Sequence, residues 1–270
     1  MGRSNHRSVE VARAKPRNPC HISCMIAGPE IILACPHCDA LAKLPTFDAI
    51  DPTGALSWTD GFQELPGVPR QPNVVRCHKC AKLYWLAVAA QIGFLMPGEV
   101  GEGERAAWNG LPAVTSTDEA GYLEALKEGL AAFPEQELEL RVFAWWRGND
   151  KHRECKTSGR FPQTAEAIAN AERLIELTMS GDHELVLFQA EALRQLGRFT
   201  EAGSALYSLC SDYNLARERQ RELIAAGSRD LDDLFTEETL IRLAEEQEAA
   251  EREFEEAGVV VEVPPEDRVS

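Results

Sequence analysis

The chain has 270 residues, of which 44% are hydrophobic. This length allows one large domain or two modest ones, with enough apolar content for a core. The net charge of −16 is uneven, because residues 1–100 carry 10 Lys and Arg against 8 Asp and Glu, whereas residues 101–270 carry 18 against 36. This asymmetry predicts two units with different surfaces. The chain lacks the strongly positive charge that is typical of nucleic-acid-binding proteins, and the acidic half would repel phosphate groups.

The longest apolar run, residues 81–96, is interrupted by Lys82 and Gln91. It is shorter than the 18 or more apolar residues typical of a membrane span. The N-terminus is basic and lacks the apolar segment of a secretion signal. We therefore expect a soluble, cytoplasmic protein.

Residues 1–24 contain five Lys and Arg residues, one Glu and few apolar side chains. A segment of this composition buries too little surface to offset the entropy of ordering, so we expect disorder. Met25 stands directly before the first organised segment, which makes it an alternative translation start. Cys20 and Cys24 lie four positions apart and are an alternative, auxiliary metal pair.

Two C-x-x-C pairs dominate the cysteine pattern. Cys35 and Cys38 form the first pair, and Cys77 and Cys80 form the second, with 38 residues between them. Each pair predicts a tight turn that points both sulfur atoms inward, and two such turns supply four thiolates to one tetrahedral ion. We therefore predict one bound zinc ion, with a rubredoxin-like iron centre as the alternative metal.

Apolar segments of β character flank both pairs. Residues 31–34 enter the first turn and 41–45 leave it, while residues 74–76 enter the second and 83–86 leave it. Strand, metal turn and strand, repeated twice, is the layout of a zinc ribbon, which we assign to residues 25–96. The turn-rich link between the pairs includes Trp58 and Phe62, which we expect to cover the small core of this ribbon.

Residues 97–116 are rich in Gly and Pro and predict a linker. Helical periodicity follows over residues 117–256, and residues 257–270 read as a tail. Ser116 to Glu119 supply N-cap chemistry for the first helix, which we expect to stop at Pro134. A partner helix is expected to end at Gly148–Asn149 before a polar stretch, residues 150–162. Further helices are expected at 165–178, 185–196, 200–212 and 236–256. The predicted fold class is therefore α+β, a small β zinc ribbon followed by an all-α domain of helical hairpins.

Residues 186–209 resemble a tetratricopeptide repeat. The second half of that pattern has a Gly, an aromatic residue two positions on, an Ala three further and then large apolar residues. These positions are held here by Gly197, Phe199, Ala202, Leu206 and Leu209. The first half is looser, with Val186, Ala190 and Leu193 at the expected positions, and Asn214 replaces the usual closing Pro. Taken whole, the chain resembles bacterial proteins of unassigned function that combine an N-terminal zinc ribbon with tetratricopeptide-like helices. The resemblance implies a bacterial scaffold and brings no reaction with it.

Four thiolates would fill the coordination shell of the ion, so we expect the metal site to be structural, and folding of residues 25–96 to depend on it. His37 and His78 lie inside the turns, where we expect exposed spacers. The stretch Lys151 to Cys155 places a His three residues before a Cys, but no third orienting group is evident. The sequence also lacks G-x-S-x-G, H-E-x-x-H and a phosphate-binding Gly loop. We therefore expect no enzymatic activity, and we expect Trp145 and Trp146 to be packing residues.

We expect a non-enzymatic protein-interaction scaffold that binds a protein partner through the helical domain. The alternative is a nucleic-acid-binding accessory protein that uses a basic–aromatic face near the second metal turn. That face would consist of Arg70, Arg76, Lys79, Lys82, Tyr84 and Trp85. Basic groups interleaved with aromatic rings suit contact with single strands.

Overall fold

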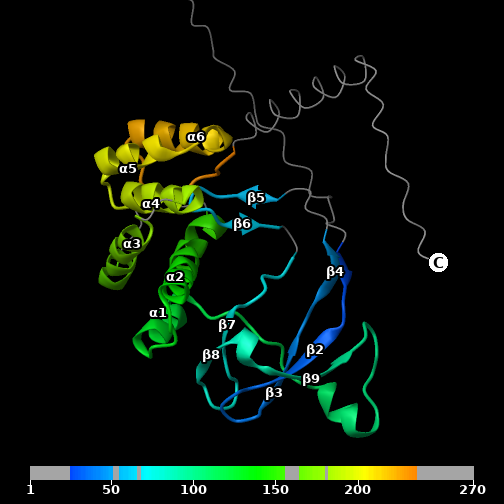
Figure 1. Ribbon diagram of the computed structural model, residues 1–270. Helices are drawn as coiled ribbons and strands as arrows, with labels where there is room; N and C mark the ends of the chain where they lie inside the picture. The colour runs from blue at the N-terminus through cyan, green and yellow to red at the C-terminus, as the bar shows by residue number, and fades with distance from the viewer. Residues whose placement is uncertain (1–24, 51–54, 66–67, 156–163, 180–181, 236–270) are drawn as a thin grey trace, which may run out of the picture.

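The computed structural model describes residues 25–50, 55–65, 68–155, 164–179 and 182–235. Within these residues the protein is of mixed α+β class, with a sheet-rich N-terminal region followed by a helical C-terminal region (Figure 1). The expected disorder of residues 1–24, the helix at 236–256 and the tail at 257–270 lie outside the described residues. No helix among the described residues is long and apolar enough to cross a membrane.

In the part of the chain that the structure describes, the sheet region consists of four small antiparallel sheets. The largest has the strand order β3-β2-β9, with β2 (Glu30–Ala34) paired to β3 (Leu41–Leu44) on one side and to β9 (Ala90–Leu95) on the other. The remaining pairs are β1 (Met25–Ala27) with β4 (Phe47–Ile50), β5 (Leu56–Ser57) with β6 (Gln63–Glu64), and β7 (Val74–Arg76) with β8 (Leu83–Trp85). The strands predicted on both sides of each C-x-x-C pair are therefore present.

Residues 97–116, expected as a linker, are attached to the largest sheet. The backbone of Lys43 is hydrogen-bonded to Pro112 and Val114, at 2.8 Å in both cases. Trp108, at the end of a 3-10 helix (Gly103–Trp108), lies so close to Gly93 on β9 that a Cβ there would meet its ring at 2.6 Å. This segment thus extends the sheet region toward the first helix.

Among the described residues, six α-helices make up the C-terminal region. They are α1 (Glu119–Lys127), α2 (Pro134–Cys155), α3 (Ala165–Leu177), α4 (His183–Gln195), α5 (Phe199–Ala205) and α6 (Asn214–Ala225). Asp118 caps α1 as its chemistry predicted, because its side chain accepts a hydrogen bond from the backbone N–H of Gly121 at 2.9 Å. The predicted helices at 165–178 and 185–196 are confirmed.

Three helix boundaries differ from the prediction. Pro134 does not stop a helix but is the first residue of α2, where its missing N–H costs no hydrogen bond. Gly148 does not end α2, which continues to Cys155. It lies against α1, where a Cβ would be 2.8 Å from a carboxylate oxygen of Glu119, so the small residue serves close helix packing. The predicted helix 200–212 ends at Ala205 and continues as two short 3-10 turns before α6, which was not predicted.

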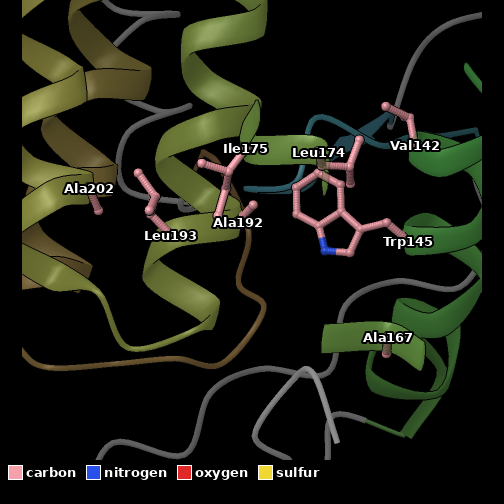
Figure 2. Close-up of a cluster of buried hydrophobic side chains, with 8 residues drawn as sticks. All are labelled: Val142, Trp145, Ala167, Leu174, Ile175, Ala192, Leu193 and Ala202. Carbon is pink, nitrogen blue, oxygen red and sulfur yellow. The ribbon is translucent and has the colours of Figure 1, made fainter. Parts of the chain in front are cut away.

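The main core of the helical region lies between α2, α3, α4 and α5. Its buried side chains, drawn in Figure 2, are Val142, Trp145, Ala167, Leu174, Ile175, Ala192, Leu193 and Ala202. A second cluster crosses between the two regions, because Val74 and Leu83 of β7 and β8 pack with Tyr122, Ala125 and Leu140 of α1 and α2. The sheet region and the helices therefore share apolar core.

Candidate metal centre and the joint hairpin

The four predicted ligands meet at one point. The sulfur atoms of Cys35, Cys38, Cys77 and Cys80 all lie within 4.8 Å of one another. Cys35 Sγ lies 3.9 Å from Cys80 Sγ, and Cys38 Sγ lies 3.6 Å from Cys77 Sγ. A tetrahedral thiolate site with metal–sulfur bonds of about 2.3 Å needs sulfur atoms roughly 3.8 Å apart. The donor set and its spacing therefore fit one metal ion.

The two cysteine turns have the same backbone geometry. The N–H of Asp39 donates to the carbonyl of Cys35 at 3.0 Å, and that of Ala81 donates to the carbonyl of Cys77 at 2.9 Å. Asp39 and Ala81, each directly after the second cysteine of its pair, have φ angles of 56° and 60°. These are the two non-glycine residues with positive φ among the described residues, and a left-handed conformation costs an L-residue roughly 1–2 kcal/mol. This strained conformation is part of the turn geometry that directs both sulfur atoms of each pair to one point.

Burial raises the pKa of a cysteine thiol, whereas hydrogen bonds from backbone N–H groups lower it. Burial raises the pKa of the Cys35 thiol to about 12. Burial also acts to raise the pKa of Cys77, but the backbone amides of Cys80 and Lys79, both 3.4 Å from its sulfur, lower it to about 6. A thiolate on Cys77 is therefore stabilised before any metal binds. A cation bound at the site would supply the charge that the other buried thiol needs to lose its proton.

The other residues singled out in the sequence take no part in this cluster. His37 and His78 are exposed, as expected of spacers. Cys210 is half-buried and lies outside the cluster, while Cys20 and Cys24 lie outside the described residues. Trp145 is buried in the helical core, as predicted for a packing residue.

The expected basic–aromatic face is divided between several partners. Arg70 forms an ion pair with Asp150 at 2.9 Å, and Arg76 forms one with Glu124 at 2.7 Å. Tyr84 is buried beneath the metal turns, and the indole N–H of Trp85 donates to the carbonyl of Leu130 at 3.0 Å. Two of the four cations thus have carboxylate partners, Tyr84 is buried and Trp85 is half-buried.

A second cluster of buried polar and charged side chains lies where β5, β6 and their turn contact the helices. We call residues 56–64 the joint hairpin. Trp58 and Phe62 were expected to cover the zinc ribbon, but this was wrong. Phe62 packs edge-on against Trp146 of α2, with ring centroids 5.4 Å apart, and the guanidinium of Arg153 lies 5.7 Å from the ring of Trp58. The joint hairpin therefore lies on the helical region.

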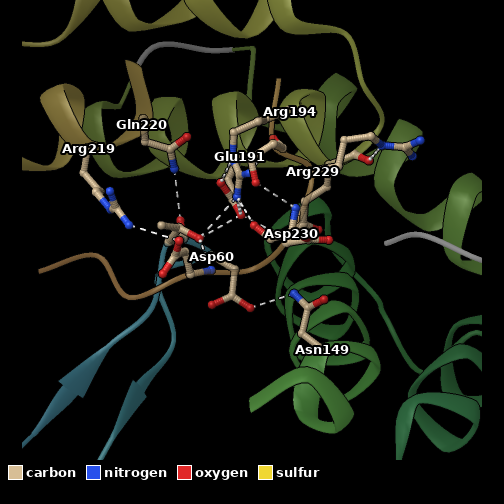
Figure 3. Close-up of polar contacts among 12 residues, drawn as sticks. Asp60, Asn149, Glu191, Arg194, Arg219, Gln220, Arg229 and Asp230 are labelled. Carbon is tan, nitrogen blue, oxygen red and sulfur yellow. Dashed lines mark hydrogen bonds and ion pairs between the residues drawn. The ribbon is translucent and has the colours of Figure 1, made fainter. Parts of the chain in front are cut away.

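Asp60, at the tip of the joint hairpin, is fully buried. Its carboxylate accepts a hydrogen bond from Asn149 Nδ2 at 2.7 Å (Figure 3). It also accepts one from the guanidinium of Arg153, which like Asn149 lies on α2. Burial raises the pKa of Asp60, although Arg153 and Asn149 act to lower it. The backbone carbonyl of Asp60 also accepts from the indole N–H of Trp146 at 2.9 Å. The tip is thus held through both its side chain and its backbone.

Thr59 is bound by a second set of buried groups on α4 and α6. Its hydroxyl donates to Glu191 Oε1 at 2.9 Å, and its carbonyl accepts from Gln220 Nε2 at 3.1 Å. Glu191 is paired with Arg194 at 2.6 Å, and both side chains are completely buried. Arg194 also donates to the carbonyls of Ser228 and Asp230. Figure 3 shows this network between α2, α4, α6 and the segment after α6.

Sequence reasoning missed this network. One pattern in α4 could have indicated it. Glu191 and Arg194 are three positions apart and interrupt the apolar side of the helix, which is typical of a buried ion pair. In α2, Arg153 was assigned to a polar loop, whereas it is a buried helical residue. The partner Asp60 is 93 positions away, and no pattern in the sequence connects the two.

The comparisons with known proteins give no identity. No family model, no curated protein and no solved structure has significant similarity to this chain.

Proposed function

We propose that this protein is a non-enzymatic protein-interaction scaffold. One Zn²⁺, held by the four cysteine thiolates, stabilises the sheet region, and the helical region binds a segment of a protein partner. Zinc is favoured because four thiolates in a tetrahedron are its common structural donor set. Such a shell leaves no open position for a substrate. Reduced thiols are the usual state in the cytoplasm, which supports a cytoplasmic protein.

One observation carries the interaction role. Helices α2 and α6 already hold an irregular segment, residues 58–62, by donating side-chain hydrogen bonds to its backbone carbonyls, and Glu191 on α4 accepts one from the Thr59 hydroxyl. Bonds from side chains to a bound backbone are the chemistry with which a scaffold holds an irregular segment. The side chains of these helices thus include donors that can hold the backbone of a bound peptide.

The packing of α4 and α5 supports the tetratricopeptide-like part of the proposal. Gly197, with a φ angle of 81°, ends α4, and the N–H of Arg198 donates to the carbonyl of Leu193 at 2.8 Å. This pattern reverses the chain within two residues. Ala190 and Ala202 are completely buried, which lets the helices approach closely. We assign one repeat-like hairpin on this basis.

Metal content tests the first half of the proposal. We expect one zinc per chain in purified protein, a colourless sample, and loss of the metal in Cys77→Ala. A red, iron-containing protein would contradict the choice of zinc. An unchanged metal content in Cys77→Ala would contradict the ligand set.

A photo-crosslinking amino acid at two positions tests the second half. Leu215 on α6 lies beside the joint hairpin, and Lys79 is exposed on the second metal turn. We expect p-benzoylphenylalanine at position 215 to capture a discrete partner from native cells, and the same group at position 79 not to capture it. Capture of the same protein from position 79 alone would place the partner on the metal region and contradict the proposal.

A further inference from the structure

A cavity of about 370 Å³ opens beside the joint hairpin. Its walls come from the joint hairpin, α4, α6 and the segment that follows α6. Four aromatic rings line it, those of Trp58, Phe188, Tyr213 and Phe235. Ligand cavities in proteins occupy about 300–1,000 Å³, so this one is at the lower end of that range. It can therefore take a group of about the size of one large side chain with its flanking amides.

Two buried polar atoms belong to residues that line this cavity. The indole Nε1 of Trp58 and the amide Oε1 of Gln220 have no hydrogen-bond partner in the described part of the protein. Trp58 is 7% exposed and Gln220 is 0% exposed, so neither atom is solvated by bulk water. An unpaired polar atom of this kind costs about 1–3 kcal/mol. Both costs would be removed by one ligand that offers an acceptor and a donor.

The orientation of the Gln220 amide is fixed by its other end. Gln220 Nε2 donates to the carbonyl of Thr59 at 3.1 Å, as the dashed line in Figure 3 shows. A flipped amide would set two oxygen atoms against each other, so Oε1 remains the free acceptor. The indole of Trp58 differs from those of Trp85, Trp145 and Trp146, which donate to Leu130, Gln195 and Asp60 respectively.

Charge restricts the ligand further. Of the described residues that line the cavity, only Glu184 is charged. An anionic ligand would meet this carboxylate without a compensating cation, and a buried cation would need a closer counter-charge than one rim residue. The cavity is therefore suited to a neutral, mainly apolar group.

We propose that this cavity binds one uncharged apolar side chain of a partner protein, with a flanking peptide N–H donating to Gln220 Oε1 and a flanking peptide carbonyl accepting from Trp58 Nε1. An aromatic side chain suits the four aromatic walls best. This inference rests on the proposed function and names the chemistry of its partner. The joint hairpin beside the cavity is already held through its own backbone carbonyls, which supports a peptide as the ligand.

The test uses the full chain and N-acetyl-L-phenylalaninamide, which carries an aromatic ring between two amides. Its binding is followed by the indole N–H signals in a ¹H–¹⁵N correlation spectrum, with Trp58 assigned by Trp58→Phe. We expect a saturable shift of the Trp58 signal at roughly millimolar probe, as a ligand of this size allows. The Trp85 signal should stay in place, because its indole is paired and does not line the cavity.

Three controls make the result specific. N-acetyl-L-phenylalanine, which has a carboxylate in place of one amide, should bind at least tenfold more weakly. Gln220→Met should weaken binding of the amide probe by a similar factor. Ala216→Leu should abolish it by filling the cavity from α6. A Trp58 signal that does not move, or that moves equally with both probes, would overturn the inference.

The two proposals fail separately. If the probe does not bind and Ala216→Leu leaves partner capture from position 215 unchanged, the inference is overturned and the proposed function stands. If the probe binds but position 215 captures no protein, the assignment to a protein partner is overturned together with the proposed function.

Discussion

Replacing Arg153 with methionine removes the cationic partner of a fully buried carboxylate. Asp60 would keep the hydrogen bonds from Asn149 Nδ2 at 2.7 Å and from the backbone N–H of Phe62 at 3.1 Å, but not a counter-charge. Breaking a buried pair in this way costs about 3–5 kcal/mol, because the remaining charge is uncompensated. We expect Arg153→Met to lower the free energy of unfolding by this amount, measured by urea denaturation at pH 7.

The loss should depend on the charge of Asp60. In an Asp60→Asn background we expect Arg153→Met to cost at least about 2 kcal/mol less, since no buried carboxylate remains. Arg219→Met is the matched control. Arg219 pairs with Asp232 at 3.0 Å, and the Asp232 side chain is 45% exposed, so the control should cost less than about 1 kcal/mol.

The pH dependence gives a second measurement on the same variant. Burial raises the pKa of Asp60 above its ordinary value of 3.8, and loss of Arg153 would raise it further. A carboxyl group whose pKa is raised on folding destabilises the native state increasingly as the pH rises above its unfolded value. The deficit of Arg153→Met should therefore be larger at pH 7 than at pH 4. A deficit below about 1 kcal/mol, or one that does not change with pH, would refute the role assigned to this pair.

Three further outcomes are expected. Removal of the metal with a strong chelator should expose the two cysteine turns and the strands beside them, β2, β3, β7 and β8, to proteolysis while α3 to α6 remain resistant, because the closed thiolate site stabilises these strands; equal protection with and without metal would contradict this. Ala81→Gly should stabilise the metal-loaded protein by about 0.5–1 kcal/mol, since its φ of 60° is unstrained for glycine, and thermal denaturation measures the change. Gly61→Ala should destabilise by about 2 kcal/mol or more, because its φ is 77° and a Cβ would lie 2.2 Å from the ring of Phe188. Gly110→Ala, with no atom within 4 Å of its Cβ, is the control for the last variant, and equal costs at both glycines would refute the steric argument.

The sequence by itself determined the four candidate metal-ligating cysteines and most of the elements. Four cysteines in two C-x-x-C pairs have few ways to lie other than around one ion, and the structure brings all four together. Short-range patterns also placed the strands around both turns, the cap at Asp118 and the hairpin at Gly197. These features depend on neighbours within a few residues, which the sequence displays directly.

The tertiary structure alone decided how the two regions are joined. Asp60 meets Arg153, and Thr59 meets Glu191 and Gln220, across separations of 93, 132 and 161 positions. Pairings at such distances depend on the packing of α2, α4 and α6, and α6 itself was not predicted. Polar residues in a sequence indicate exposure by default, so a buried polar network is recognised only when its members are seen together. The positions of Trp58 and Phe62 were likewise decided by the tertiary structure. Their apolar character predicted burial but did not specify which surface of the protein would bury them.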